Sequence, residues 1–532
     1  MHKLPTIHKI IETTTPEGSV ELVYADRPKN LNEMLYKTVS RYGDLEGFID
    51  QDTRLSFNQF ASAVNKVAAT LYHVYGIRKG DRVAIMLRNG LEFATSFFAI
   101  ARLGAITVTL NTGLKGEDVA YQVNDSGSVL LIIEPDFADF INEVKLVAGG
   151  LKHIFSTGIE PLEGTIAFSE LLKDEGYTSV EAEVDEMDSG VIMYTSGTTG
   201  KPKGALLSYR GLIASAMNAV SLCDLQVGRD KMMAMVPLFH TTGLSMVFCA
   251  AVYSGIPLVL IKKFKSADSL KIIEDEKITI IIGVPTIFWL MLNEPEFGRY
   301  DLSSLRYLAA GGSSSPEDLL KTCAEKLPGV QLVPGYGLTE ANAMTHSTAT
   351  FDEALSKNGS VGLVAPLLDA MIVDNSGNEL PAGEPGELLL KGCQVMKGYW
   401  NNPVATRETV IDGWLHTGDI AAIDEDGYTY IFDRMKDMII RGGENIYSIE
   451  IENVLYRNPK VLEAAVLGVP DPVFGEQVKA VIVLRPGEQA TNEEFQEFCR
   501  KSLANFKVPK FVEFREALPR NPAGKVIKGE LK

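Results

Sequence analysis

Hydrophobic segments of two periodicities alternate along the chain, and this alternation constrains the fold most strongly. The apolar run Asp81–Leu87 is followed by a helix-like pattern over Leu91–Leu103 and a strand-like run over Ala105–Leu110. A helix over Glu117–Asn124 and a strand over Val129–Ile133 continue the series. Strands that alternate with helices form βαβ units, so we predict a mainly parallel sheet.

A second series of the same kind begins after residue 230. It predicts strands and helices in alternation over Met232–Val236, Gly243–Tyr253, Pro257–Ile261, Ala267–Glu276, Ile278–Gly283, Thr286–Leu292, Leu305–Ala310, Pro316–Leu327 and Val330–Val333. From about Asn358 to Tyr430 the pattern changes to short alternating runs with many Gly and Pro. This change predicts a smaller β-rich sub-domain.

The last hundred residues resemble a compact α+β unit. We predict strands over Ala464–Leu467 and Lys479–Leu484, separated by a turn at Gly468–Pro472. A helix begins near Asn492, because a capping box at Thr491 precedes an apolar face made of Phe495, Phe498, Cys499 and Leu503. The predicted fold class is therefore α/β: a large N-terminal domain (1–434) of two α/β sub-domains plus a small β-rich sub-domain, then a small mobile α+β domain (435–532).

The segment Tyr194–Gly204 interleaves glycines with Ser, Thr and Lys side chains directly after an apolar run. Such a loop lets its backbone approach a polyanion while side chains donate hydrogen bonds, so it predicts phosphate binding. It is not a Walker P-loop, because Gly197 and Gly200 are too close together and Pro202 follows Lys201 where that motif needs a hydroxyl.

Composition limits the setting and the partners. A chain of 532 residues exceeds what one core usually supports. Its net charge of −18 argues against a nucleic-acid surface. No signal peptide and no membrane span are predicted, because no stretch reaches about eighteen apolar residues. The five cysteines and seven histidines show neither disulfide nor zinc spacing, which favours the cytoplasm.

Five motifs, in order, carry a resemblance to a known family. They are Tyr194–Gly204, Tyr336–Glu340, His416–Asp419, Asp433–Lys436 and Pro519–Lys525. Together they resemble the AMP-forming adenylating superfamily, which includes acyl-CoA synthetases, peptide-synthetase adenylation domains and firefly-type luciferases. The resemblance runs from about residue 30 to the end and implies the division into a large N-terminal and a mobile C-terminal domain.

The resemblance implies an ATP site and assigns its residues. Glu340 suits Mg²⁺, a hard cation that takes oxygen ligands, and Thr195 lies beside it. Lys525 is the catalytic lysine, which would stabilise charge between the carboxylate and the α-phosphate. Nucleotide contacts fall on Thr195, Ser196, Gly197, Thr198, Thr199, Gly200, Lys201, Lys203, Gly311, Gly312, Ser313, Gly335, Tyr336, Gly337, Leu338, Thr339, Asp419, Arg434 and Lys525.

A second half-reaction with CoA is implied by the same family pattern. Lys436 matches the hinge about which the C-terminal domain rotates, and Gly442, Gly443 and Gly475 fall in segments that would face CoA. The acyl pocket falls on segments that contain His240, Val284, Ala310 and Gly311. Because His240 is the only side chain of these segments that could carry charge, an uncharged acyl tail fits better than a second carboxylate.

These residues predict an acid–CoA ligase that uses ATP, Mg²⁺ and CoA and releases AMP and pyrophosphate. One alternative is an acyl-AMP ligase that loads a carrier protein. Another is a non-catalytic nucleotide-binding regulator. A third is a luciferase-type oxygenase, which the motifs alone do not distinguish from a ligase. The sequence does not specify the acid, the pathway or the oligomeric state, although members of the family often form homodimers.

Overall fold

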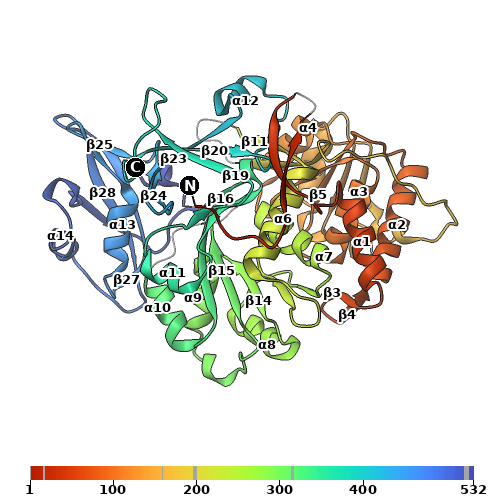
Figure 1. The fold of residues 1–532 in the computed structure, drawn as a ribbon, viewed down its shortest axis with the longest axis horizontal. Helices are drawn as coiled ribbons and strands as arrows, with labels where there is room; N and C mark the ends of the chain where they lie inside the picture. The colour runs from red at the N-terminus through yellow and green to blue at the C-terminus, as the bar shows by residue number, and fades with distance from the viewer. Residues whose placement is uncertain (1, 16–17, 159, 196–200, 313–316, 521–525) are drawn as a thin grey trace. The chain divides into compact units, whose positions relative to one another are not determined.

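A computed structural model describes residues 2–15, 18–158, 160–195, 201–312, 317–520 and 526–532 (Figure 1). The chain divides into two compact units. The first comprises Met1–Ser315, Leu319–Asp369 and Leu390–Leu415, and the second comprises Pro316–Asp318, Ala370–Leu389 and His416–Lys532. The domain boundary between residues 434 and 435 stays a prediction.

An eight-stranded sheet in the first unit has the order β21-β11-β10-β6-β5-β7-β8-β9. The six strands from β10 to β9 are parallel, and β11 and β21 add antiparallel strands. The first predicted α/β series is thus confirmed. The strands are β5 (Arg82–Met86), β6 (Ile106–Thr109), β7 (Leu130–Ile133), β8 (His153–Ser156), β9 (Ile166–Ala167), β10 (Ser189–Thr195), β11 (Lys203–Ser208) and β21 (Gly398–Tyr399).

A nine-stranded sheet, also in the first unit, has the order β18-β17-β16-β15-β14-β12-β13-β3-β4. Its strands from β16 to β3 are parallel, whereas β17, β18 and β4 are antiparallel additions. The strands are β3 (Glu46–Asp50), β4 (Thr53–Ser56), β12 (Met232–Ala234), β13 (Leu258–Leu260), β14 (Ile280–Gly283), β15 (Tyr307–Gly311), β16 (Gln331–Leu338), β17 (Ala343–Ser347) and β18 (Leu363–Val364).

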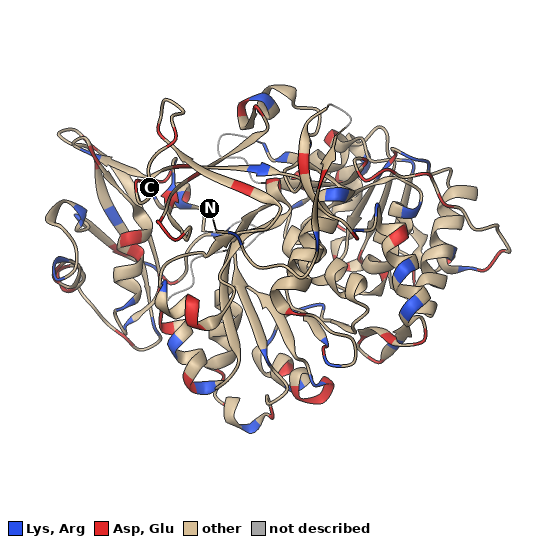
Figure 2. Cartoon of the chain, viewed as in Figure 1, with Lys and Arg blue, Asp and Glu red and all other residues tan. Residues whose placement is uncertain are grey.

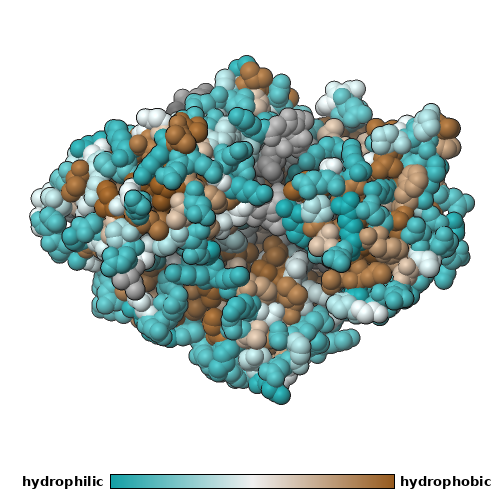
Figure 3. Space-filling model, turned by 180° about the vertical axis from the view of Figure 1, so that it is seen from behind, coloured by the Kyte–Doolittle hydropathy of each residue, from teal (hydrophilic) through white to brown (hydrophobic). Residues whose placement is uncertain are grey.

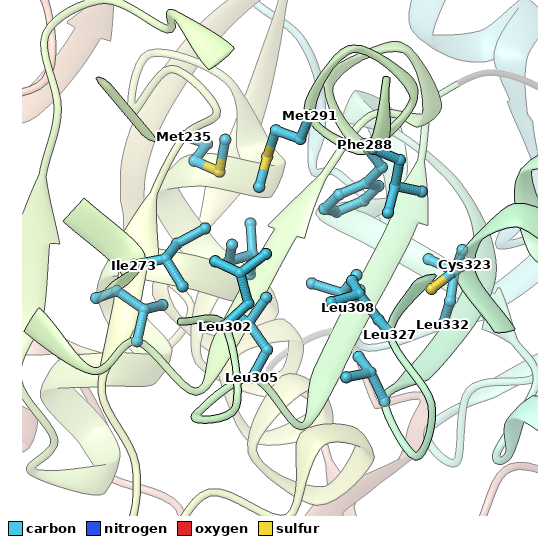
Figure 4. Close-up of a cluster of buried hydrophobic side chains, with 14 of the residues drawn as sticks. Met235, Ile273, Phe288, Met291, Leu302, Leu305, Leu308, Cys323, Leu327 and Leu332 are labelled. Atoms are coloured by element: carbon cyan, nitrogen blue, oxygen red, sulfur yellow. The ribbon is translucent and has the colours of Figure 1, made fainter. Parts of the chain in front are cut away.

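Helices of the first unit pack their apolar faces on these sheets. They are α1 (Leu31–Tyr42), α2 (Phe57–His73), α3 (Leu91–Arg102), α4 (Gly116–Ser126), α5 (Phe140–Val147), α6 (Tyr209–Cys223), α7 (Ala250–Ser254), α8 (Ser266–Glu276), α9 (Pro285–Leu292), α10 (Glu317–Lys326), α11 (Phe351–Ser356) and α12 (Pro403–Thr409). Figure 4 shows one core cluster, in which Met235, Phe288 and Leu308 come together from a strand end, a helix and a strand. Such burial of apolar surface is the main force that holds sheet and helices together.

The helix predicted over Gly243–Tyr253 differs in its winding. Its first part is a π-helix, η3 (Thr242–Cys249), which continues into α7. The helix begins against the preceding backbone, since a Cβ atom on Gly243 would lie 2.1 Å from the Pro237 carbonyl oxygen. Periodicity alone does not distinguish a π-turn from an α-turn over so short a stretch.

The second unit contains most of a five-stranded sheet with the order β19-β20-β23-β22, to which β24 adds on β23. Its other sheet has the order β26-β25-β28-β27, with β29 on β28, and it packs against α13 (Ser448–Tyr456) and α14 (Asn492–Arg500). The strands are β19 (Leu368–Val373), β20 (Gly386–Gly392), β22 (Val410–Ile411), β23 (Trp414–Ile423), β24 (Thr429–Arg434), β25 (Ile439–Arg441), β26 (Glu444–Ile446), β27 (Val461–Asp471), β28 (Gly475–Leu484) and β29 (Phe511–Phe514).

The turn predicted at Gly468–Pro472 is wrong. Strand β27 continues through Asp471, which pairs with Gly475 across the hairpin, so the chain reverses at residues 472–474. Pro470 is tolerated inside this strand because β27 forms the edge of its sheet. On the open side of an edge strand, the N–H group that proline lacks has no neighbouring strand to bond.

Charged and apolar surface residues are dispersed. Figure 2 shows Lys and Arg interspersed with Asp and Glu along the ribbon. On the face drawn in Figure 3, hydrophilic side chains predominate and hydrophobic ones occur between them. Among the described residues, none of the helices has both the length and the apolar character needed to cross a membrane.

A buried ionic cluster fastens the N-terminal segment to the first unit. Glu186, 8% exposed, accepts bonds from Arg27 Nε at 2.7 Å and Arg210 Nη2 at 2.9 Å. Arg210 also donates to Glu21 at 2.8 Å. Burial alone would raise the pKa of Glu186, but the two guanidinium groups outweigh it and lower the pKa from 4.5 to about 2.

We predict that Glu186→Gln lowers the free energy of unfolding at pH 7 by about 3 kcal/mol, because the charged form is the stabilised one. Since the pKa is depressed in the folded state, this contribution is present above pH 4.5 and is lost as the pH falls towards about 2. Urea unfolding of both proteins at pH 7 and pH 3 measures the difference, which should shrink at pH 3. Exposed Glu163→Gln is the control, and a pH-independent difference for Glu186→Gln would contradict the prediction.

Candidate functional site

The predicted phosphate loop joins two antiparallel strands of the eight-stranded sheet. Thr195 ends β10 and pairs with Lys203, which begins β11. On its other edge β10 is parallel to β6, so Thr195 lies at the carboxyl end of a parallel strand, where ligands of α/β folds bind. Of the residues predicted here, Ser196, Gly197, Thr198, Thr199 and Gly200 lie outside the described part of the chain.

The Glu340 carboxylate lies next to the end of β10, although it is distant in sequence. Thr195 Oγ1 is 3.3 Å from Glu340 Oε1, and the hydroxyl of Tyr399 donates to the same oxygen at 2.9 Å. The three residues come from β10, the short helix η5 (Thr339–Ala341) and β21. A half-buried carboxylate that accepts two hydroxyl groups is held in one orientation, as a metal or phosphate site requires.

Two ammonium groups beside the loop lie over aromatic rings. Lys203 Nζ is 5.2 Å from the centre of the Tyr399 ring, and Lys201 Nζ is 4.8 Å from that of Tyr121. Tyr121 also donates to the Pro202 carbonyl oxygen at 3.2 Å. These contacts place positive charge at the mouth of the hairpin, where it can meet a polyanion.

Tyr336 lies just beyond the point where the parallel pairing of β16 with β15 ends. Gly335 pairs with both Gly311 of β15 and Ser347 of β17, whereas Tyr336 pairs with His346 of β17, and a register irregularity follows at Gly337. A Cβ atom on Gly337 would lie 1.6 Å from the Ala343 carbonyl oxygen, so only glycine fits there. The predicted motif Tyr336–Glu340 therefore begins in the last residues of β16, which ends at Leu338, and continues into η5, which begins at Thr339.

The predicted acyl residues lie at the carboxyl ends of neighbouring parallel strands. His240 follows β12, Val284 follows β14, and Ala310 and Gly311 end β15, in a sheet where these three strands are adjacent. A Cβ atom on Gly312 would lie 3.6 Å from Val284, so the β14 and β15 ends are in contact. The structure thus brings these residues to one edge of the sheet. Ser313, predicted as a nucleotide contact beside Gly312, lies outside the described residues.

In the second unit, Asp419 and Arg434 are opposite one another on β23 and β24. Arg434 Nε is 3.2 Å from Asp419 Oδ1, and Asp419 is 3% exposed. The preceding residues are fixed by Glu387, which accepts from the Gly418 amide at 3.1 Å and contacts His416 Nδ1 at 2.9 Å. The motif around Asp419 is therefore a rigid strand segment and not a plain turn.

The glycines predicted to face CoA meet within the second unit. Gly442 and Gly443 form the two-residue turn between β25 and β26 with φ of +62° and +90°, which favours glycine at both positions. The Gly442 amide donates to the Phe474 carbonyl oxygen at 2.7 Å, and Gly475 pairs with Arg441. The predicted hinge residue Lys436 is exposed in the turn between β24 and β25, and Lys525 lies outside the described residues.

Sequence reasoning missed Tyr399, which touches both Glu340 and the Lys203 ammonium. The only signal was its place in the pattern Gly398–Trp400, which by itself is not specific. Among the described residues there is no group of three or more His, Cys, Asp or Glu side chains that could hold a metal. A metal at Glu340 would therefore need oxygen ligands from a substrate.

Comparison with known proteins agrees for both parts of the chain. A family model described as AMP-binding enzyme matches residues 35–400, and one described as AMP-binding enzyme C-terminal domain matches residues 450–525. A long-chain-fatty-acid–CoA ligase of Bacillus subtilis (strain 168) is 36% identical over 530 residues, which cover 94% of each chain. A feruloyl-CoA synthase of an Amycolatopsis species is 37% identical over 482 residues, or 90% of this chain and 94% of that one.

Solved structures of the same fold exist as well. The anthranilate CoA ligase AuaEII, in complex with anthranoyl-AMP, superimposes with a TM-score of 0.88 at 29% identity and covers 95% of this chain and 98% of its own. The predicted α/β fold with a large first part and a small C-terminal part is confirmed by this agreement.

We predict that Gly337→Ala lowers the free energy of unfolding by about 3 kcal/mol, because a Cβ atom there meets backbone and forces β16 and β17 apart. Gly298→Ala is the control, since nothing lies within 4 Å of the position of its Cβ atom. Thermal unfolding of the two variants measures the effect. Equal stability of the two variants would show that the strands yield without cost.

Proposed function

Because the chain belongs to the AMP-binding enzyme family, we propose that it is an acid–CoA ligase. It activates a carboxylic acid with ATP to an acyl-AMP and pyrophosphate, then transfers the acyl group to the thiol of CoA. The observation that carries the proposal is the meeting of Thr195, Glu340 and Tyr399 at the end of the predicted phosphate loop. Two relatives support it, a long-chain-fatty-acid–CoA ligase and a feruloyl-CoA synthase, because this chain matches nearly the whole length of each.

In the first half-reaction, a carboxylate oxygen of the acid attacks the α-phosphorus and the bond to pyrophosphate breaks. Both reactants are anionic, so the site must neutralise charge and align them. We assign this task to Lys201 and Lys203 beside the loop, and to Lys525. The flat face of Tyr336 is assigned to adenine, and Asp419 with Arg434 to the ribose hydroxyls, since an ionised carboxylate only accepts hydrogen bonds.

Magnesium fits the residues around Glu340. The carboxylate oxygen of Glu340 and the hydroxyl of Thr195, 3.3 Å apart, are the hard donors that this ion prefers. We propose that both residues hold Mg²⁺ together with phosphate oxygens. When bound, the ion supplies charge neutralisation for the triphosphate.

We propose that the second half-reaction requires a different arrangement of the predicted C-terminal domain (435–532). The thiol of CoA attacks the acyl carbonyl carbon and AMP leaves with its phosphate. We propose that rotation about Lys436, an exposed turn residue between two strands, withdraws Lys525 and presents the Gly442–Gly443 turn to the thiol arm. The close meeting of this turn with Gly475 supports a narrow backbone approach to CoA.

The acid is proposed to be an apolar monocarboxylic acid. The strand ends at Val284 and Ala310 offer small apolar groups, and His240 is the only ionisable side chain in the described segments 237–243, 283–286 and 309–312. A second carboxylate would require a buried cation. We further propose that the protein acts in the cytoplasm, where ATP and a reduced CoA thiol are both present.

The proposal predicts the products. With an acid, ATP, Mg²⁺ and CoA, the protein should release AMP and pyrophosphate in equal amounts and form a thioester. A pyrophosphate-release screen over short, medium, long and aromatic acids, with and without CoA, measures this. Appearance of ADP would refute the proposed reaction. Transfer of the acyl group to a carrier protein but not to CoA would show that the acceptor is the carrier protein.

We predict that single substitutions slow one half-reaction without slowing the other. Lys525→Ala should slow adenylate formation by a factor on the order of 10² to 10³, as for loss of an electrostatic donor, and spare thioester formation from added acyl-AMP. Lys436→Pro should do the reverse and accumulate acyl-AMP, because a φ fixed near −65° hinders rotation.

Lys501→Ala, at an exposed lysine of the same unit, is the matched control and should leave both rates unchanged. Pyrophosphate release reports the first step and thioester from supplied acyl-AMP the second. Equal slowing of both steps by each substitution would rule out the two-conformation mechanism.

A further inference from the structure

Three buried side chains form a continuous chain of hydrogen bonds in the first unit, which ends on two backbone carbonyl groups. The Tyr24 hydroxyl, at the end of the N-terminal hairpin of β1 (Ile10–Thr14) and β2 (Val20–Tyr24), donates to Asn218 Oδ1 on α6. Asn218 Nδ2 donates to Gln394 Oε1 at 2.7 Å. Gln394 Nε2 in turn donates to the carbonyl oxygens of Met344, at 3.1 Å, and Ala341, at 3.4 Å.

The direction of this chain is fixed by its last partners. Two carbonyl oxygens can only accept, so Gln394 must present its amide nitrogen to them and its oxygen to Asn218. Asn218 must then present its nitrogen to Gln394 and its oxygen to Tyr24, whose hydroxyl has to donate. Because Tyr24, Asn218 and Gln394 are at most 2% exposed, no solvent replaces a lost partner.

The chain ends on the turn that carries Glu340. The Glu340 carbonyl oxygen accepts from the Met396 amide at 2.7 Å, and Asn342 Nδ2 donates to the Gln394 carbonyl oxygen at 2.8 Å. Asn342 adopts a φ of +55°, which asparagine tolerates better than most residues, and its own amide donates to Thr339. The turn is therefore bonded to the Gln394 segment at Glu340 itself and at the residues that follow it.

We propose that Gln394 is a positioning residue for the Glu340 carboxylate, and that the N-terminal hairpin sets it through Tyr24 and Asn218. Gln394 is fully buried and bonded to protein groups, so it would act through Glu340. It holds the carbonyl groups of Ala341 and Met344, which follow Glu340 in the chain, so that Glu340 Oε1 stays within reach of Thr195 and Tyr399. The inference rests on the proposed role of Glu340 toward a divalent cation and nucleotide, and it assigns a functional task to residues that precede the matched family region, 35–400.

Gln394→Glu tests the proposal because it keeps the shape of the side chain but cannot donate to the two carbonyl groups when ionised. The measurement is Mn²⁺ binding by electron paramagnetic resonance, with α,β-methylene-ATP present so that no turnover occurs. We expect the dissociation constant of Mn²⁺ to rise about 5- to 10-fold in Gln394→Glu, and to rise less but in the same direction in Tyr24→Phe. Thioester formation from supplied acyl-AMP should change less than twofold.

Two controls separate a positioning role from a merely structural one. Thr38→Val removes a buried hydroxyl that bonds the Val252 carbonyl oxygen at 2.7 Å elsewhere in the first unit, and it should lower thermal stability without changing Mn²⁺ binding. Gln394→Met, which is uncharged and also lacks the donor, should weaken Mn²⁺ binding like Gln394→Glu. Unchanged Mn²⁺ binding in both Gln394 variants would overturn the proposal.

Glu340→Gln distinguishes this inference from the function on which it rests. If Glu340→Gln weakens Mn²⁺ binding and the Gln394 variants do not, the positioning role is wrong and the proposed metal site stands. If Glu340→Gln leaves Mn²⁺ binding unchanged, Glu340 is not a metal ligand and the positioning proposal fails with it. Pyrophosphate release by the unmodified protein still tests the ligase reaction independently.

Discussion

One carboxylate oxygen joins three elements of the first unit that are distant in sequence. Glu340 Oε1 is the common acceptor for Thr195, at the end of β10, and Tyr399, on the edge strand β21. This shared acceptor joins the end of β10, η5 and β21 through side chains, beside the contact of the Lys203 ammonium with the Tyr399 ring. Hydrogen bonds from two hydroxyl groups to a carboxylate stabilise a half-buried site more than hydrogen bonds between neutral groups do, and they fix the geometry of the three side chains.

The nine-stranded sheet likewise places predicted site residues at the carboxyl ends of its parallel strands. In a parallel sheet every strand presents its carboxyl end at one edge, so loops that are distant in sequence become neighbours. His240, Val284 and Gly311 meet in this way, and Gly335 continues the row on β16. Within the second unit, Asp419 and Arg434 are held opposite one another on the adjacent strands β23 and β24.

Much of this could be predicted from the sequence, because strongly periodic segments and glycine-rich loops report local structure directly. The α/β series and the helix from Asn492 follow from periodicity and capping. The reach of β27 to Asp471 could not be predicted, since an edge strand tolerates the proline that usually signals a turn. Tyr399 and Gln394 escaped notice because their importance comes from tertiary partners, and a tyrosine or a buried amide has no sequence signature of its own.

Isotope transfer shows whether the protein activates its acid as a mixed anhydride with AMP, as we propose. An acid labelled with ¹⁸O in both carboxylate oxygens is incubated with ATP, Mg²⁺ and CoA, and the phosphorus-containing products are analysed by mass spectrometry. We expect one labelled oxygen in each AMP formed and none in pyrophosphate. AMP without the label, or label in inorganic phosphate alongside ADP, would rule out the mixed anhydride.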